Sequence, residues 1–389
     1  MPSIADTIAR LGKLRGTNAA AGIATDPGRL KMLSSFGSNP GALRAMTYVP
    51  ERLSRPAALV VVLHGCTQSA AAYDAGAGWS QLADRHGFAL LFPEQQRQNN
   101  PNLCFNWFSS ADTRRDSGEA LSIRQMIATM VAIHDLDSER VFVTGLSAGG
   151  AMTSVMLATY PDVFAGGAII AGLPYGCATT VPQAFERMRG HQLPTEGELA
   201  ALVRDASPYE GPWPTISIWH GSGDATVNPT NADAIIGQWR TLHGVAREPD
   251  RVEAIDGYPR RVWRDEAGRE VIEEYSITGM GHGTPLDTAG AKGFGAAGPF
   301  MLEANISSTY HICRFWGLIT ADAADSRLNE GVTARPALVP EPNPKELSRA
   351  QAATNPRPER VSSVRDSGAA GGGVGKIIED ALRTAGLMR

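Results

Sequence analysis

Short apolar runs alternate with amphipathic stretches through the middle of the chain. The run LVVVL at residues 59–63 is typical of a strand that is covered on both faces in a parallel sheet. Apolar residues at helical spacing predict helices between such runs. The expected strands are 59–63, 88–92, 140–144, 164–171 and 215–219, and the expected helices are 79–86, 118–134 and 147–160. This alternation predicts an α/β fold with a doubly wound, mostly parallel sheet and helices on both faces.

The alternation breaks inside the chain and fades at both ends. Residues 174–213 predict an insertion over one edge of the sheet, a candidate lid or substrate wall. Residues 252–278 contain two strand-like runs on either side of DEAGRE, which is typical of a hairpin, and 306–319 predict a closing helix. We therefore expect an N-terminal extension with a short amphipathic helix at 1–41, one main domain at 42–320, and a Pro/Gly-rich C-terminal tail at 321–389.

The composition is that of a globular protein and excludes several classes of function. Of the 389 residues, 43% are hydrophobic and 20% are charged, which excludes global disorder. A formal net charge of −4 offers no basic excess for phosphates, so we expect no nucleic-acid partner. No apolar run approaches the ~18 residues of a membrane helix. The N-terminus has no uninterrupted apolar stretch of a secretory signal, which favours the cytoplasm.

The four cysteines lie at scattered positions: Cys66, Cys104, Cys177 and Cys313. They are too few for a disulfide scaffold, and the absence of CxxC spacing argues against structural zinc. We expect no metal and no cofactor. Cys66 is either a free thiol or the partner of Cys104 in a bridge, and the sequence leaves both alternatives open.

The segment GLSAG at 145–149 fits the motif G-x-S-x-G. A predicted strand precedes it and a predicted helix follows it, so Ser147 falls on a sharp turn that exposes its hydroxyl and needs small neighbours. The alternatives are a Gly-rich turn used only for packing, or a phosphate loop. The spacing matches neither common phosphate-loop motif. We therefore predict that Ser147 is a nucleophile.

A nucleophilic serine needs a base, and the base needs an orienting acid. Asp224 closely follows the strand predicted at 215–219, at the edge where such sheets place their sites. His282 lies in the Gly-rich loop GMGHG, from which the imidazole can reach the serine. The order Ser147, Asp224, His282 is that of α/β-hydrolase triads. The rival acids are Asp205, Asp233 and Asp256, and the rival histidines, which we expect to be structural, are His220, His243 and His311.

The oxyanion that forms during acyl transfer needs two preformed donors. The N–H of Ala148, directly after the nucleophile at the start of a helix, is one candidate. The loop after the strand 59–63 supplies the other, the N–H of Cys66. We expect His64 to brace this loop and not to take part in the chemistry.

A long loop is expected at 94–117, and it carries aromatic residues. Trp107 in this loop is either part of a hydrophobic plug or part of a substrate wall. The stretch DTRRDSGEA at 112–120 has charges of both signs, which predicts a solvated, salt-bridged segment.

Five motifs occur in this order along the chain: LHGCTQ, CFNWF, GLSAGG, WHGSGD and GMGHG. Together they resemble the poly(3-hydroxybutyrate) depolymerase family of esterases, which is related to the feruloyl and acetylxylan esterases of carbohydrate esterase family one. The resemblance covers roughly residues 42–318 and implies an α/β-hydrolase fold and carboxylic-ester hydrolysis without a metal. It assigns the triad to Ser147, Asp224 and His282, the oxyanion donors to Cys66 and Ala148, and a place near the substrate to Trp107.

The sequence therefore predicts a serine esterase that works through an acyl-enzyme. A poly(3-hydroxybutyrate)-type polyester or a hydroxyalkanoate oligomer is the expected substrate. A feruloyl or acetyl carbohydrate ester is the alternative, and a non-catalytic binding protein with a hydrolase fold is the remote one. Secreted members of the family have signal peptides and polymer-binding domains, so the resemblance favours an extracellular or periplasmic location, against the expectation from the N-terminus. The sequence carries no signal for the oligomeric state.

Overall fold

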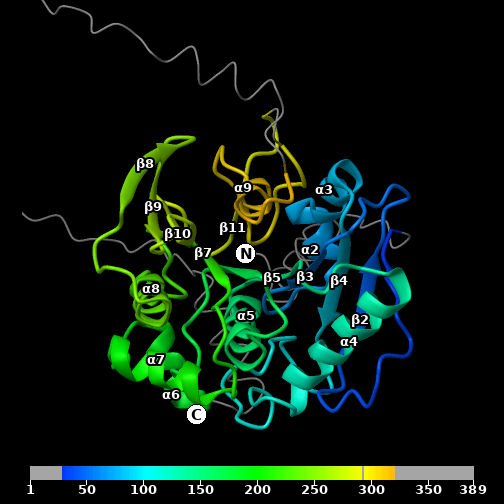
Figure 1. The fold of residues 1–389 in the computed structure, drawn as a ribbon, viewed down its shortest axis with the longest axis horizontal. Coiled ribbons are helices and arrows are strands. Elements are labelled where there is room, and N and C mark those ends of the chain that lie inside the picture. Colours follow the sequence, from blue (N-terminus) through cyan, green and yellow to red (C-terminus); the bar gives the residue numbers. More distant parts are fainter. Residues whose placement is uncertain (1–28, 291–292, 320–389) are drawn as a thin grey trace, which may run out of the picture. The chain divides into compact units, whose positions relative to one another are not determined.

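A ten-stranded sheet forms the centre of the computed structural model, which describes residues 29–290 and 293–319 (Figure 1). The strands are β1 Lys31–Met32, β2 Arg44–Tyr48, β3 Leu59–Leu63, β4 Ala89–Glu94, β5 Val141–Leu146, β6 Gly166–Ile170, β7 Thr215–Gly221, β8 Arg251–Ile255, β9 Tyr258–Arg264, β10 Glu270–Ile277, β11 Thr284–Leu286 and β12 Met301–Glu303. Their order in the sheet is β1-β2-β4-β3-β5-β6-β7-β10-β9-β8, and β11 and β12 form a separate pair. The strands from β4 to β10 in this order run parallel. Antiparallel strands extend the sheet at both edges.

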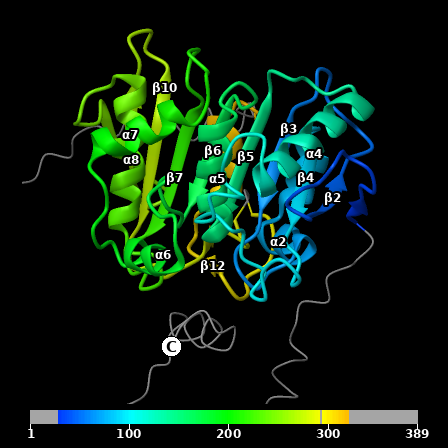
Figure 2. The same ribbon diagram turned by 90° about the horizontal axis from the view of Figure 1, so that it is seen from below.

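Helices cover both faces of the sheet (Figures 1 and 2). The helices are α2 Ala70–Ala77, α3 Trp79–His86, α4 Gly118–His134, α5 Ala148–Thr159, α6 Val181–Met188, α7 Glu196–Asp205, α8 Thr230–His243 and α9 Ser308–Phe315. One apolar core lies between the sheet and α4, α5, α7 and α8, and a second lies between the sheet and α2, α3 and α9. The predicted doubly wound α/β architecture is therefore confirmed.

Burial explains why the central elements have such apolar sequences. Every residue of β3, β5 and β6 is buried, as expected for strands that have a helical layer on each side. Helix α5 is also buried at every position. It consists of alanine, glycine and other residues without charge, because no side of it faces water.

The predicted elements at 59–63, 79–86 and 118–134 have the observed bounds. The hairpin expected around DEAGRE is formed by β9 and β10, but the strand-like run before DEAGRE divides into β8 and β9, a division that the sequence did not predict. The insertion at 174–213 contains α6 and α7, and α7 packs on α8 and α5. The predicted N-terminal helix and C-terminal tail lie outside the described residues.

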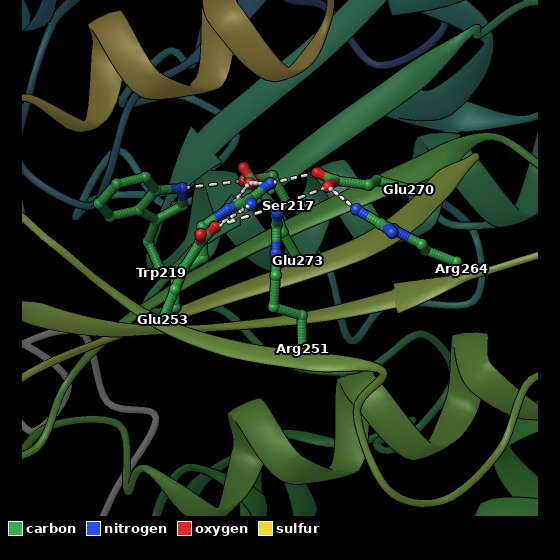
Figure 3. Close-up of polar contacts among 8 residues, drawn as sticks. Ser217, Trp219, Arg251, Glu253, Arg264, Glu270 and Glu273 are labelled. Carbon is green, nitrogen blue, oxygen red and sulfur yellow. Dashed lines mark hydrogen bonds and ion pairs between the residues drawn. The ribbon is translucent and has the colours of Figure 1, made fainter. Parts of the chain in front are cut away.

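A network of charged side chains holds β8, β9 and β10 to β7 (Figure 3). Arg260 on β9 donates to Glu253 on β8 at 2.7 Å and to Glu270 on β10 at 2.5 Å. It also donates to Glu273 on β10 at 2.7 Å, and Glu273 accepts a hydrogen bond from the hydroxyl of Ser217 on β7 at 2.7 Å. Burial raises the pKa of Glu273 to about 7, although the positive charge of Arg260 opposes that shift. The network therefore pairs three carboxyl groups of β8 and β10 with one guanidinium group at this edge of the sheet.

Candidate active site

Ser147 lies in a strained turn between β5 and α5. Its φ of 58° and ψ of −117° fall in a region that residues with a side chain rarely adopt. Its N–H donates to the carbonyl of Ile170 on β6 at 2.9 Å, and its carbonyl accepts from Ala151 at 2.8 Å. These bonds hold the turn, and the serine follows β5 directly at the carboxyl end of the strand. This is the geometry of the predicted strand-to-helix elbow.

Glycine is required at two positions around this elbow. A Cβ on Gly145 would lie 2.4 Å from the carbonyl oxygen of Gly149. A Cβ on Gly149 would lie 2.3 Å from the carbonyl oxygen of Leu63 and 2.6 Å from that of His64. The first turn of α5 therefore touches the backbone where β3 ends. The two segments that are expected to donate to the oxyanion lie side by side.

The loop after β3 is held by a disulfide and by a buried histidine. Cys66 is bonded to Cys104, which decides between the two alternatives left open by the sequence. His64 Nε2 accepts the backbone N–H of Gln95 at 3.1 Å, so its proton is on Nδ1, which donates to the carbonyl of Gly65 at 2.8 Å. Burial lowers the pKa of His64 and keeps the ring neutral. His64 therefore braces this loop, as predicted.

Asp224 and His282 form a buried hydrogen-bonded pair. His282 Nδ1 lies 2.7 Å from Asp224 Oδ2, and the two residues are 8% and 4% exposed. The other oxygen, Oδ1, accepts the backbone N–H groups of Thr226 at 2.8 Å and Val227 at 2.9 Å. Burial opposes ionisation of Asp224, but its hydrogen bonds with His220 and His282 hold its pKa well below the usual range. The carboxylate is therefore ionised and can stabilise a positive charge on His282.

The loops that carry this acid and this histidine are bonded to each other. Strands β7 and β10 pair in parallel as far as Gly221, so the two loops leave the sheet together. Gly223 N–H donates to the carbonyl of Met280 at 3.0 Å, and Gly279 N–H donates to Ser222 Oγ at 2.8 Å. A Cβ on Gly221 would lie 2.2 Å from the Met280 carbonyl oxygen. These contacts explain how residues 58 positions apart meet.

His220 is a contact of Asp224 that the sequence analysis did not assign. Its Nε2 lies 2.8 Å from the carbonyl oxygen of Val227 and 3.4 Å from Asp224 Oδ2. Its Nδ1 is buried without a hydrogen-bond partner in the part of the chain that the structure describes. The ring therefore supports the turn that holds the acid. The available signal was its position at the end of β7, four residues before Asp224.

The rival acids and histidines lie elsewhere: Asp205 is exposed at the end of α7, and the others have other partners. Asp256 and His311 form a separate pair, with 2.8 Å between Asp256 Oδ2 and His311 Nε2. Asp233 pairs with Arg261 at 3.2 Å. His243 is the last residue of α8, as predicted, and burial lowers its pKa to about 4. Asp224 and His282 are thus the pair brought to the carboxyl edge of the sheet.

Two predicted contacts of the site are not seen in the structure. The structure shows no hydrogen bond between Ser147 and His282, a bond that often tightens only when substrate binds. Trp107 is 8% exposed, contacts Phe108 edge-on at 5.4 Å and belongs to the apolar core. This packing fits the hydrophobic plug. A role for Trp107 near the substrate remains a prediction.

Taken together, these groups are the ones that acyl transfer requires. Ala148 is the first residue of α5, so its N–H has no partner within the helix and is available to an anion.

Over residues 29–290 and 293–319, no group of three His, Cys, Asp or Glu side chains could hold a metal ion. None of the described helices is long and apolar enough to cross a bilayer.

Comparison with known proteins points to one group of enzymes. The family model described as esterase PHB depolymerase matches residues 44–254. Poly(3-hydroxyalkanoate) depolymerase C of Paucimonas lemoignei is 49% identical over 292 residues, which cover 75% of this chain and 70% of that protein. Feruloyl esterase B of Talaromyces stipitatus is 33% identical over 67% of this chain and 74% of that protein. The structure of an acetyl xylan esterase from Aspergillus awamori aligns with a TM-score of 0.64 at 26% identity, over 75% of this chain and 100% of that one.

Proposed function

We propose that this chain, which belongs to the esterase PHB depolymerase family, hydrolyses the ester bonds of poly(3-hydroxyalkanoates) or of their oligomers through an acyl-enzyme on Ser147. It is a carboxylic ester hydrolase of the α/β-hydrolase fold. The observation that carries the polyester substrate is the identity to a poly(3-hydroxyalkanoate) depolymerase, 49% against 33% for a feruloyl esterase.

In the proposed first step, Ser147 Oγ attacks the ester carbonyl and His282 Nε2 takes its proton. Nδ1 of the same ring keeps its proton in the 2.7 Å bond to Asp224. The imidazolium that forms is stabilised by the carboxylate, whose low pKa keeps it ionised. The buried position of the pair strengthens this interaction because little water screens it.

The carbonyl oxygen becomes negative in the tetrahedral intermediate and accepts the N–H groups of Cys66 and Ala148. The second donor belongs to the N-terminus of α5, whose dipole favours an anion. When the intermediate collapses, the carbon–oxygen bond to the alcohol breaks and His282 returns its proton to that alcohol. Water then attacks the acyl-enzyme by the same route, which releases a 3-hydroxy acid and restores Ser147.

The proposed catalytic domain spans 42–320, with the insertion at 174–213 as one wall of the substrate site. In support, α6 lies toward the same end of the sheet as α2 and β12 in Figure 2. The carbonyl of Met188, at the end of α6, accepts the N–H of Asn228 at 2.7 Å, four residues after Asp224. The insertion is therefore tied to the loop that carries the acid.

A feruloyl or acetyl carbohydrate ester is the second candidate substrate. It is favoured by the full-length alignment with an acetyl xylan esterase. Initial rates on a 3-hydroxybutyrate trimer, methyl ferulate and an acetylated xylo-oligosaccharide separate the candidates, with Ser147→Ala as the background. We expect kcat/KM to be highest for the trimer by about tenfold or more, which corresponds to roughly 1.4 kcal/mol of transition-state binding. A higher value for methyl ferulate or for the acetylated xylo-oligosaccharide would overturn the polyester assignment.

A further inference from the structure

Glu119 is a buried acid that the mechanism above does not use. It lies in the first turn of α4 and is 0% exposed. The charges of both signs at 112–120 predict a solvated, salt-bridged segment. This is correct for Arg115, which pairs with Asp162 at 2.7 Å, and wrong for Glu119. Burial raises the pKa of Glu119 to about 8.

The Glu119 carboxyl accepts three hydrogen bonds, all from N–H groups of two residues. Oε1 accepts Gln95 Nε2 at 2.6 Å and Asn106 Nδ2 at 2.8 Å. Oε2 accepts the backbone N–H of Asn106 at 2.9 Å. Among the described residues, three N–H donors and no cation contact this carboxyl, an arrangement that only a group rich in acceptors can satisfy. Burying a carboxyl without a cation is costly, and the three hydrogen bonds offset part of that cost.

Gln95 carries the first connection from Glu119 to the oxyanion loop. Its backbone N–H donates to His64 Nε2 at 3.1 Å, and His64 Nδ1–H donates to the carbonyl of Gly65 at 2.8 Å. The Gly65 carbonyl and the Cys66 N–H belong to one planar trans peptide and point in opposite directions. Holding the carbonyl therefore holds the direction of the N–H that is the proposed oxyanion donor.

The second connection runs along the loop after β4. Asn106 binds Glu119 through both its backbone and its side chain and directly precedes Trp107. The carbonyl of Cys104 accepts Gln95 Nε2 at 3.1 Å, and Cys104 is joined to Cys66 by the disulfide. The loop after β4 is thus bonded to the Glu119 carboxyl, and it is joined to the oxyanion loop by the disulfide and by the Gln95–His64 hydrogen bond.

We propose that Glu119 is a positioning residue for the oxyanion hole. By anchoring Gln95 and Asn106 it fixes the Gly65–Cys66 peptide and the segment that carries Trp107. This inference rests on the proposed function, in which the Cys66 N–H binds the oxyanion. Glu119 contacts Gln95 and Asn106 and none of the proposed reacting groups, so it acts mainly through the position of the Cys66 N–H, which binds the oxyanion in the transition state.

Glu119→Gln tests this inference with little change in shape. The amide oxygen can replace one carboxyl oxygen, but the amide nitrogen then faces an N–H donor and at least one of the three bonds is lost. We expect kcat on p-nitrophenyl butyrate to fall by about 10- to 100-fold with KM within about threefold. The affinity for an alkyl trifluoromethyl ketone, which forms an oxyanion adduct, should fall by the same factor.

Glu273→Gln is the matched control. Glu273 is also a glutamate with a pKa raised by burial and is 1% exposed, but it belongs to the Arg260 network of Figure 3. This variant should lower Tm and leave kcat within about threefold, because it removes a buried acceptor away from the oxyanion loop. Should Glu119→Gln fail to fold, Gln95→Leu removes the same connection and is expected to give the same loss of kcat.

The inference is overturned if Glu119→Gln, or Gln95→Leu in its place, keeps the kcat of the wild type. It is also overturned if kcat falls while the affinity for the ketone does not. Failure of the proposed function looks different, because the wild-type protein itself would then neither hydrolyse the butyrate ester nor bind the ketone.

Discussion

Asparagine at position 224 would change one hydrogen bond of the proposed triad and leave its shape intact. The N–H groups of Thr226 and Val227 lie 2.8 and 2.9 Å from Asp224 Oδ1, so they will hold the amide oxygen at that position. The amide nitrogen then takes the place of Oδ2, 2.7 Å from His282 Nδ1, and donates to it. An imidazole that accepts at Nδ1 carries its proton on Nε2, so it cannot take the proton of Ser147.

The wrong tautomer of the base typically costs about 10⁴-fold in kcat, or roughly 5 kcal/mol of transition-state stabilisation. We expect a loss of that size for Asp224→Asn on p-nitrophenyl butyrate at neutral pH, with Ser147→Ala as the background. Far-UV circular dichroism should be unchanged, since the two backbone bonds to Oδ1 remain. A variant that keeps more than about a tenth of the wild-type kcat would refute the reasoning.

Asp256→Asn is the matched control for that experiment. Asp256 also binds a buried histidine, with Oδ2 2.8 Å from Nε2 of His311, but this pair joins the turn after β8 to α9. The same chemical change there should leave kcat within about threefold, because no reacting atom is involved. A loss comparable to that of Asp224→Asn would mean that the two pairs had been assigned in the wrong roles.

Three further predictions concern the supports of the site. Cys104→Ser opens a disulfide that spans 38 residues, which should lower the free energy of unfolding by about 3–4 kcal/mol. The oxyanion loop is then held less firmly, so kcat should fall about tenfold. Unchanged kinetics in the variant would contradict this prediction. Gly149→Ala places a Cβ 2.3 Å from a backbone oxygen at the end of β3, so it should lower both Tm and activity. Gly197→Ala is the control, because a Cβ there has nothing within 4 Å, and it should lower neither Tm nor activity. The pKa of His243 is about 4 in the folded protein and about 6.5 in the unfolded chain. The unfolded chain therefore binds a proton at this residue at a higher pH, and the free energy of unfolding falls as the pH drops from about 6.5 to 4. Urea titrations at those two pH values should show a loss of at most about 3 kcal/mol that His243→Gln lacks, and equal losses in both proteins would exclude the assignment.

Strands and helices that are buried along their length could be predicted from the sequence. The run at 59–63 is apolar at every position because both of its faces are covered. Such a continuous run can be identified as a strand without knowing which strands it pairs with. The proposed triad could be predicted for a related reason. Ser147 follows such a strand directly, Asp224 lies three residues after another, and the Gly-rich loop of His282 follows β10.

Features that depend on distant contacts could not be predicted in this way. Strand β8 has no buried residue, and the sequence RVEAI does not mark it as a strand separate from β9, with which it pairs. Glu119 lies in a charged stretch, and its burial depends on donors at Gln95 and Asn106 in another loop. Nothing in the sequence distinguishes His220 from another histidine at the end of a strand, because its contact with Asp224 forms only when the turn between them folds.

The central claim is that Ser147 is the nucleophile that forms the acyl-enzyme. The most direct measurement is the reaction of the protein with a fluorophosphonate, followed by mass spectrometry of its peptides. We expect a single phosphonyl adduct, located on the peptide that contains Ser147, and no adduct on Ser147→Ala. An adduct on another residue, or a Ser147→Ala protein that is labelled like the wild type, would contradict the account.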